Sequence, residues 1–301
     1  MKTRTKVLLA FLGVAVLLIV VGVVFGSSGQ NEAYKPQEEF KLDTWIALKA
    51  GPLDLSINKA VLYLFLASAA TVGTMTYIAR RMTDKPNRVQ TAVETAYVLI
   101  RDNITSGNMD KRMAAKWFPF IGALFLFIWF SNLIGYLPLP TNSEETFNLF
   151  GLEIPSFALY AATANISVPL VLTLVVWFSY HAEGVRTHGV RGYFATFIPA
   201  GTPSAMRIPI FVIEVISHFV RIISLSVRLF ANILAGHLLI LFMAGGLSIL
   251  LGIAALGLVT TAAIAVPFYL FEVVLIATLQ AFIFATLTSI YLGGATSAEG
   301  H

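Results

Sequence analysis

The residues best able to do chemistry lie in the stretch 224–241, SLSVRLFANILAGHLLIL, where an arginine, an asparagine and a histidine interrupt an apolar run. Arg228 is the last lysine or arginine of the chain, and only two acids, Glu272 and Glu299, follow it. A charge at the centre of a bilayer costs about 2.5–3.5 kcal/mol on insertion scales. Because arginine stays protonated, it cannot avoid this cost by becoming neutral. Arg228 therefore requires a negative partner.

That partner does not lie on the same stretch of helix. The neighbours of Arg228 three and four residues away are Ser224, Leu225, Ala231 and Asn232, and none of them is acidic. Within the chain, the one acid deep in a later apolar segment is Glu272. The counter-charge is therefore either Glu272, in a fixed structural pair, or an acid of another polypeptide.

The polar residues of this region share one helix face. At 100° per residue, the side chains that lie within about 80° of one another are Glu214, His218, Arg221, Arg228 and Asn232. His237 points about 180° away from Arg228. Glu214 is spaced to pair with Arg221 or His218, either to hold helices together or as part of an ion route.

The composition indicates that most of the chain lies in a membrane. Hydrophobic residues make up 57% of 301 residues and charged residues 12%, and the mean hydropathy is +0.80. These values predict an all-α polytopic membrane protein. The chain has no cysteine, which excludes disulfides and thiolate metal sites. Its basic residues cluster in short loops beside apolar runs, a pattern that indicates membrane topology and not nucleic-acid binding.

The apolar runs predict about five core spans plus an N-terminal segment. We expect spans at 60–79, 117–137 and 162–180, followed by two long tilted helices at 208–251 and 252–294 that form a hairpin, the second kinked at Pro267. The apolar run 7–25 is either an anchor helix or a signal peptide. The predicted domains are an N-terminal anchor or signal-like segment (1–30), an external polar segment (31–59, a loop or short surface helix), a helical membrane domain (60–295) and a tail (296–301).

Charge sets the expected orientation. Residues 80–116 carry eight basic and four acidic side chains and should face the cytoplasm, whereas 138–161 contains acids but no lysine or arginine and should face outside. Apolar positions at helical spacing after Pro86-Asn87 predict an amphipathic helix that is either bound to the inner surface or an ordinary loop helix. The C-terminus is then predicted to be cytoplasmic.

The motif SLSVRLFANILAGH, from Ser224 to His237, resembles the signature of the a subunit of rotary, F-type ATP synthases. The run from Gln280 to Tyr291 resembles the last helix of that family, and Asn132-Leu-Ile-Gly-Tyr-Leu-Pro138 and Thr163-Ala-Asn165-Ile-Ser167 match earlier motifs more loosely. The resemblance covers roughly residues 40–293. It implies a proton-conducting stator in the CF(0) sector of a bacterial inner membrane, with the c-ring, the peripheral-stalk subunit b and lipid as partners.

The resemblance also implies roles for individual residues. Arg228 would attract the ring carboxylate and stop protons from leaking between two offset half-channels. Glu214 and Arg221 would lie near the cytoplasmic exit. The outer half-channel would be lined by Asn232, His237, Glu272 and Gln280, with Asn132, Asn165 and Ser167 near its mouth. No cofactor or metal is implied, and ATP chemistry would belong to other subunits, because the chain has no Walker-type loop.

The sequence departs from the family pattern at several positions. His237 stands where Glu is frequent, and Glu272 lies eight residues before Gln280 in place of seven. One extra residue turns Glu272 by about 100° around the helix axis. Gly135 and Asn165 replace acids found in some members, which makes the inlet less acidic. A stand-alone channel or secondary transporter is the alternative function, although the chain shows no paired repeats.

Overall fold

The computed structural model describes residues 40–42, 44–50, 53–54, 56–81, 83, 87–141, 146–149, 152–155, 157–199, 201–243 and 265–297. They fall into two compact units. One unit is Leu42–Leu234 with Val273–His301, and the other holds the described residues of Met1–Lys41 and Ala235–Glu272. The predicted N-terminal segment 1–30 and the turn of the C-terminal hairpin lie outside the described residues.

Five helices of the described chain are long and apolar enough to cross a membrane, which confirms the predicted polytopic all-α fold. They are Lys59–Arg80, Lys111–Gly135, Ser167–Ala195, Ser204–Leu241 and Ala265–Thr296. The first three match the predicted spans, but the second begins six residues earlier and the third ends well beyond residue 180. The apolar run marks what lipid covers, while backbone hydrogen bonding continues past it into water.

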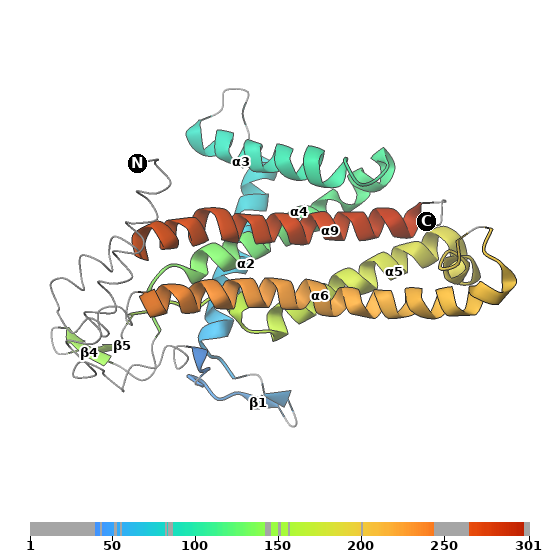
Figure 1. Cartoon of the computed structure of the whole chain (residues 1–301). Helices are drawn as coiled ribbons and strands as arrows, with labels where there is room; N and C mark the ends of the chain where they lie inside the picture. The colour runs from blue at the N-terminus through green and yellow to red at the C-terminus, as the bar shows by residue number, and fades with distance from the viewer. Residues whose placement is uncertain are drawn as a thin grey trace, which may run out of the picture. The chain divides into compact units, whose positions relative to one another are not determined.

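The elements follow one another along the chain as Figure 1 labels them. The helices are α2 (Lys59–Arg81), α3 (Arg88–Val98), α4 (Lys111–Gly135), α5 (Ser167–Ala195), α6 (Arg207–Leu241) and α9 (Ala277–Thr296). Shorter helical turns are η2 (Leu99–Thr105, π), η3 (Ala162–Ala164, 3₁₀), η4 (Ser204–Met206, 3₁₀) and η6 (Glu272–Ile276, π).

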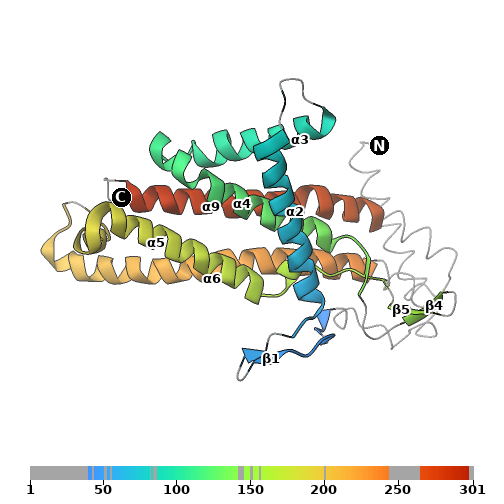
Figure 2. The ribbon, with the colours of Figure 1, turned by 180° about the vertical axis from the view of Figure 1, so that it is seen from behind.

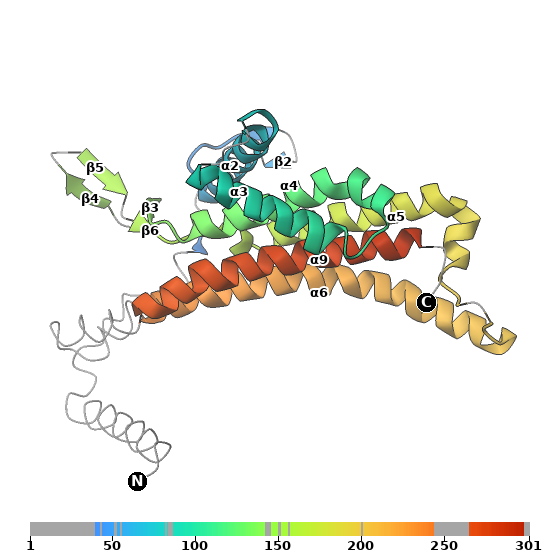
Figure 3. The same ribbon diagram turned by 90° about the horizontal axis from the view of Figure 1, so that it is seen from above.

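Helix α4 forms the centre of the larger unit, since it packs on both α2 and α9, and α5 packs on α9. Ile121, Phe125 and Ile128 on α4 are buried. Figure 2 shows α2 running across the direction of α4 and α9, and Figure 3 shows α9 alongside α6 over the part of α6 that belongs to this unit. The α6 and α9 pair confirms the predicted C-terminal hairpin of long helices as far as the described residues extend.

The amphipathic segment after Pro86 is helical, as predicted. Helix α3 begins after Asn87, whose side-chain oxygen accepts a hydrogen bond from the backbone N–H of Gln90 at 2.7 Å. This contact satisfies one of the donors left open at a helix N-terminus. Helix α3 then continues directly into the π-helical turn η2, which ends at Thr105.

The two segments predicted as external contain short antiparallel β-ladders, and in the first of them a ladder takes the place of the expected loop or short surface helix. In the first, β1 (Lys49–Ala50) pairs with β2 (Leu53–Asp54), with Gly51 and Pro52 between them. In the second, β3 (Leu139–Pro140) pairs with β6 (Phe157–Ala158), and β4 (Thr146–Leu149) pairs with β5 (Leu152–Pro155).

The end of α4 is packed closely against the segment that precedes α5. A Cβ atom added to Gly135 would overlap the Ala161 side chain, so this position has no space for a larger residue. Nearby, the Tyr160 and Tyr63 rings meet edge to face at 5.5 Å. Burial raises the pKa of Tyr160 to about 12.

Candidate functional site

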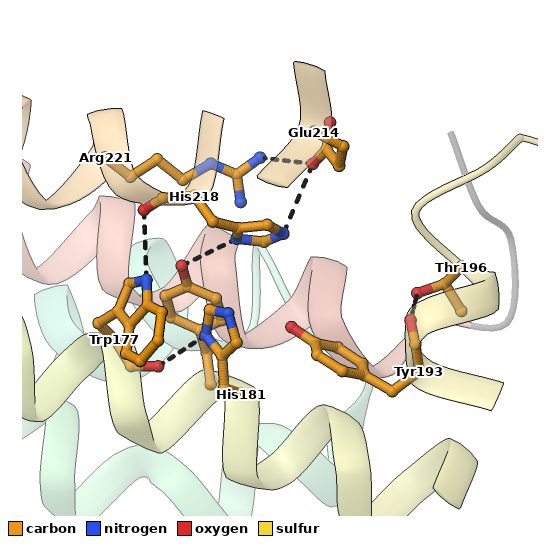
Figure 4. Close-up of polar contacts among 8 residues, drawn as sticks. Trp177, His181, Tyr193, Thr196, Glu214, His218 and Arg221 are labelled. Carbon is orange, nitrogen blue, oxygen red and sulfur yellow. Dashed lines mark hydrogen bonds and ion pairs between the residues drawn. The ribbon is translucent and has the colours of Figure 1, made fainter. Parts of the chain in front are cut away.

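The polar face predicted for α6 makes the contacts that its spacing indicated. Glu214 Oε1 lies 3.3 Å from Arg221 Nη2 and 3.6 Å from His218 Nε2. One carboxylate oxygen therefore faces both a guanidinium and an imidazole, as Figure 4 shows. The two alternatives for Glu214, pairing with Arg221 or pairing with His218, are both realised.

Helix α5 supplies the groups that hold His218 from the other side. The Tyr180 hydroxyl lies 2.9 Å from His218 Nδ1, and the Trp177 indole N–H donates to the His218 carbonyl oxygen at 3.2 Å. The tautomer with its proton on Nε2 satisfies both ring nitrogens, because Nε2–H then points at Glu214 and Nδ1 accepts from Tyr180. A continuous row of proton-carrying groups thus joins α5 to α6 (Figure 4).

These side chains border a cavity of about 290 Å³ between α5, α6 and α9. Its polar lining includes Tyr180, Tyr193, Glu214, His218, Arg221 and Tyr291. The guanidinium of Arg221 also lies over the Tyr291 ring, 5.1 Å from its centroid. A cavity of this size and polarity has space and hydrogen-bond partners for several water molecules. Carboxylate, imidazole and phenol groups beside water are suited to passing protons.

A break in α5 brings Tyr193 to the cavity. Gly189 has a φ of 71° and a ψ of 164°, so the helix is interrupted there and resumes in a new direction. Glycine reaches this left-handed region without the strain that a Cβ atom would cause. The Tyr193 ring then lies against Gly184, where an added Cβ atom would overlap it. The two glycines therefore let the second part of α5 return over the first.

Arg228 and Asn232 lie one turn apart on α6, the first half-buried and the second exposed. Arg228 makes no hydrogen bond or ion pair with any described residue of its own unit. On the same helix face, Ser224, Ala231 and Asn232 are exposed and Leu225 is buried. Arg228 is therefore a half-buried cation that has no counter-charge among the described residues of its own unit.

Of the residues expected along the outer half-channel or near its mouth, Asn132, Asn165 and Gln280 lie in the larger unit. Asn132 is fully buried, accepts a hydrogen bond from the Thr163 hydroxyl at 2.8 Å and donates to the carbonyl of Ala277 at 3.4 Å. It thereby links α4, η3 and α9. Asn165 accepts from the backbone N–H of Ser167 at 3.0 Å, at the start of α5. Gln280, on α9, is buried.

His237 and Glu272 belong to the other unit, and both side chains are buried. A Cβ atom added to Gly236 would overlap the Glu272 carboxylate, so the glycine provides the space that this carboxylate occupies. Among the described residues, no cluster of three or more His, Cys, Asp or Glu side chains could hold a metal ion.

Glu272 begins the π-helical turn η6, which ends at Ile276. A π turn takes in one residue more than an α turn, and such insertions recur at functional sites. The expectation of a 100° rotation assumed an unbroken α-helix, and that assumption is wrong here. The π turn can absorb the extra residue between Glu272 and Gln280.

Several residues of the cavity were not identified from the sequence. Tyr180, Tyr193 and Tyr291 come from α5 and α9, and their approach to α6 depends on packing between helices. His181, whose ring centroid lies 4.8 Å from that of His218, was placed beyond the end of a span. The adjacent pair Tyr180-His181 at the predicted cytoplasmic end of that span was the one available signal.

Comparisons with known proteins agree with the resemblance seen in the motifs. Residues 61–293 match the family model described as ATP synthase A chain. ATP synthase subunit a of Hyphomonas neptunium is 32% identical over 272 residues, covering 89% of this chain and 98% of that protein. The corresponding subunit of Rubrobacter xylanophilus is 34% identical over 276 residues, covering 87% of this chain and 97% of that protein. The match therefore spans nearly the whole of both chains, and this protein belongs to the ATP synthase subunit a family.

Proposed function

We propose that this chain is the proton-conducting stator subunit of an ATP synthase and that it catalyses no reaction on ATP itself. Family membership and five apolar helices support a multi-pass membrane subunit of that complex. In the proposed mechanism, two offset half-channels lead protons to and from a carboxylate on the c-ring. The ring turns because each protonated carboxylate moves into lipid and each ionised one is drawn back to the stator.

The observation that carries this proposal is the state of Arg228. A permanently charged, half-buried guanidinium in a helix apolar and long enough to span a membrane demands an anion, and its own unit offers none among the described residues. A ring carboxylate that moves past this face would meet the demand in each step. Arginine suits the role because its planar fork binds a carboxylate and never loses its charge.

The two polar regions provide candidate half-channels. We assign the cavity beside Glu214, His218 and Arg221 to the cytoplasmic exit, because it contains a carboxylate and an imidazole and lies between α5, α6 and α9. The proposed inlet residues are Asn132, Asn165, Ser167, Asn232, His237, Glu272 and Gln280. Buried amides and a buried carboxylate in apolar helices are costly unless they serve a hydrated path or an interhelical contact.

The remaining proposals concern assembly and location. The c-ring and peripheral-stalk subunit b are the proposed neighbours in a bacterial inner membrane, with the C-terminus in the cytoplasm. The proposed domain boundaries remain 1–30, 31–59, 60–295 and 296–301. A stand-alone channel or secondary transporter is the second candidate, and it differs in requiring no partner for ion flux.

Substitution of Arg228 in the assembled complex tests the proposal. Arg228→Ala should abolish proton-driven ATP synthesis in vesicles while assembly and ATP hydrolysis by the catalytic head remain. Arg228→Lys should also fail, because an ammonium lacks the planar fork. The matched control is Arg191→Ala, which removes an exposed arginine of α5 and should leave synthesis unchanged.

Synthesis at the wild-type rate in either Arg228 variant would overturn the assignment. Glu272→Gln distinguishes the remaining alternative of a fixed pair within the chain. If Glu272 were the permanent counter-charge of Arg228, removing either charge would leave the other unpaired, and both Glu272→Gln and Arg228→Ala would impair assembly. Synthesis measured with a proton uncoupler, with and without sodium, identifies the coupling ion.

A further inference from the structure

A second cavity, of about 300 Å³, lies between α2, α3 and α4, away from the polar site. Its lining is nearly all hydrocarbon and includes Ile78, Ala92, Ala96, Gly122, Leu126 and Phe130. The indole N–H of Trp129, one of the few polar groups of the lining, is already bonded to the Thr278 hydroxyl at 3.0 Å. The cavity is therefore suited to an apolar occupant.

Small residues keep this space open. Gly122 is buried in α4, yet a Cβ atom added to it would meet no atom within 4 Å. Ala92 and Ala96, one turn apart on α3, line another side. Water is disfavoured in an apolar cavity of this kind, and an empty one loses dispersion contacts along all of its surface. A flexible hydrocarbon chain would supply them.

Basic side chains stand at the ends of the same three helices. They are Arg80 near the end of α2, Arg88 at the start of α3, Arg101 in η2, and Lys111 and Arg112 at the start of α4. All five are exposed, and none makes an ion pair with a described residue. The acids Glu94, Asp102 and Asp110 in these segments are fewer. An apolar cavity between helices that carry exposed basic side chains near their ends matches an amphipathic anion.

We propose that this cavity binds one acyl chain of an anionic phospholipid, whose phosphate group is held by the arginines that include Arg80 and Arg101. Basic residues at the cytoplasmic membrane surface attract acidic lipids, and basic pockets between spanning helices favour their head groups. A helix of another subunit could also fill the cavity, but it would leave the five cations unmatched. Charge complementarity therefore favours the lipid.

The charge of the site is tested on the purified ATP synthase complex in detergent. Native mass spectrometry would count retained phosphatidylglycerol and phosphatidylcholine of identical acyl chains. The wild type should retain one more phosphatidylglycerol than the double variant Arg80→Gln, Arg101→Gln, whose affinity should fall about fivefold for each arginine removed. Arg191→Gln, an exposed arginine of α5 outside the site, should retain the wild-type number.

The cavity itself is tested with a pair of glycine variants. Gly122→Leu fills the cavity and should weaken phosphatidylglycerol binding about tenfold, whereas Gly73→Leu on α2 should not. Gly73 is the matched control because its Cβ position is equally open but the residue is exposed and does not line the cavity. If Gly122→Leu prevents assembly, the arginine variants decide the question.

Two results would overturn the proposal. One is that the wild type retains the two lipids equally and that the arginine variants do not change the number retained.

The other comes from Ala96→Cys, which introduces a single thiol because the chain has no cysteine. A photo-crosslinker on that thiol should capture phospholipid, and capture of another subunit's helix in its place would assign the cavity to a protein partner.

Discussion

At the scale of single residues, Glu214 is where the polar contacts of the exit cavity meet. Its Oε1 faces Arg221 and His218 from the same helix, and Tyr180 supports His218 from α5. A carboxylate between an imidazole and water can accept a proton on one side and release it on the other. Arg221 fixes where that carboxylate lies. We infer that Glu214 is the group through which protons leave.

This inference predicts the effect of Glu214→Gln. The amide keeps the size of the side chain and can still accept a hydrogen bond from Arg221, but it cannot bind and release a proton. ATP-driven proton pumping into inverted vesicles should slow at least about tenfold, as measured by the quenching of a pH-sensitive dye. Glu94→Gln on α3 is the control, since it removes a partly exposed carboxylate far along the chain from this cavity. Equal pumping by the two variants would remove Glu214 from the exit path.

The sequence predicted part of this site for a clear physical reason. Glu214, His218 and Arg221 lie on one helix, so the 100° step of the α-helix fixes which of them can meet. Tyr180 and Tyr291 reach the same place from α5 and α9, and no local spacing encodes that approach. The partners of a helix face are set by packing between helices, which a single sequence does not display.

At the scale of elements, the existence of the helices was predicted, but apart from a kink at Pro267 their irregularities were not. Long apolar runs require helices, because lipid offers no hydrogen bonds to the backbone. The break of α5 at Gly189 and the π turn η6 leave no trace in hydropathy. Each interruption changes the direction of the side chains around it, so the 100° step fails at these points. Both interruptions adjoin residues proposed for the proton path.

The π turn predicts an asymmetry between deletion and insertion. Deleting Val274 should convert η6 to an α turn and give Glu272 and Gln280 a seven-residue spacing, which keeps them about 20° apart around the helix axis. Proton pumping by the complex should then be retained. Inserting one alanine after Val274 adds a rotation of about 100° and should abolish pumping.

Assembly of both variants, measured by recovery of the intact complex, is the control for folding. If the deletion variant assembles and fails to pump while the insertion variant pumps, the π turn has no role in keeping register. Both variants change only the length of η6 and leave the Glu272 carboxylate in place, so the comparison tests its position and not its charge.

At the scale of the molecule, the proton path we propose is incomplete within this chain. The cavity that we assign to the exit lies along one part of α6, and Arg228 lies further along the same helix. In the proposed mechanism, this fixed cation repels protons and separates the two half-channels. The carboxylate that carries a proton past it would then belong to a neighbouring subunit.

The last prediction concerns the chain by itself. Reconstituted alone in vesicles under a potassium diffusion potential, it should pass protons no faster than empty vesicles, because neither half-channel crosses the membrane. Adding the c-ring and subunit b should raise proton flux well above that background, and Arg228→Ala should remove its coupling to rotation. A stand-alone channel or transporter makes the opposite prediction, since it would conduct without partners. Flux through the isolated chain that persists in Arg228→Ala would therefore contradict the stator mechanism and favour a stand-alone channel or transporter.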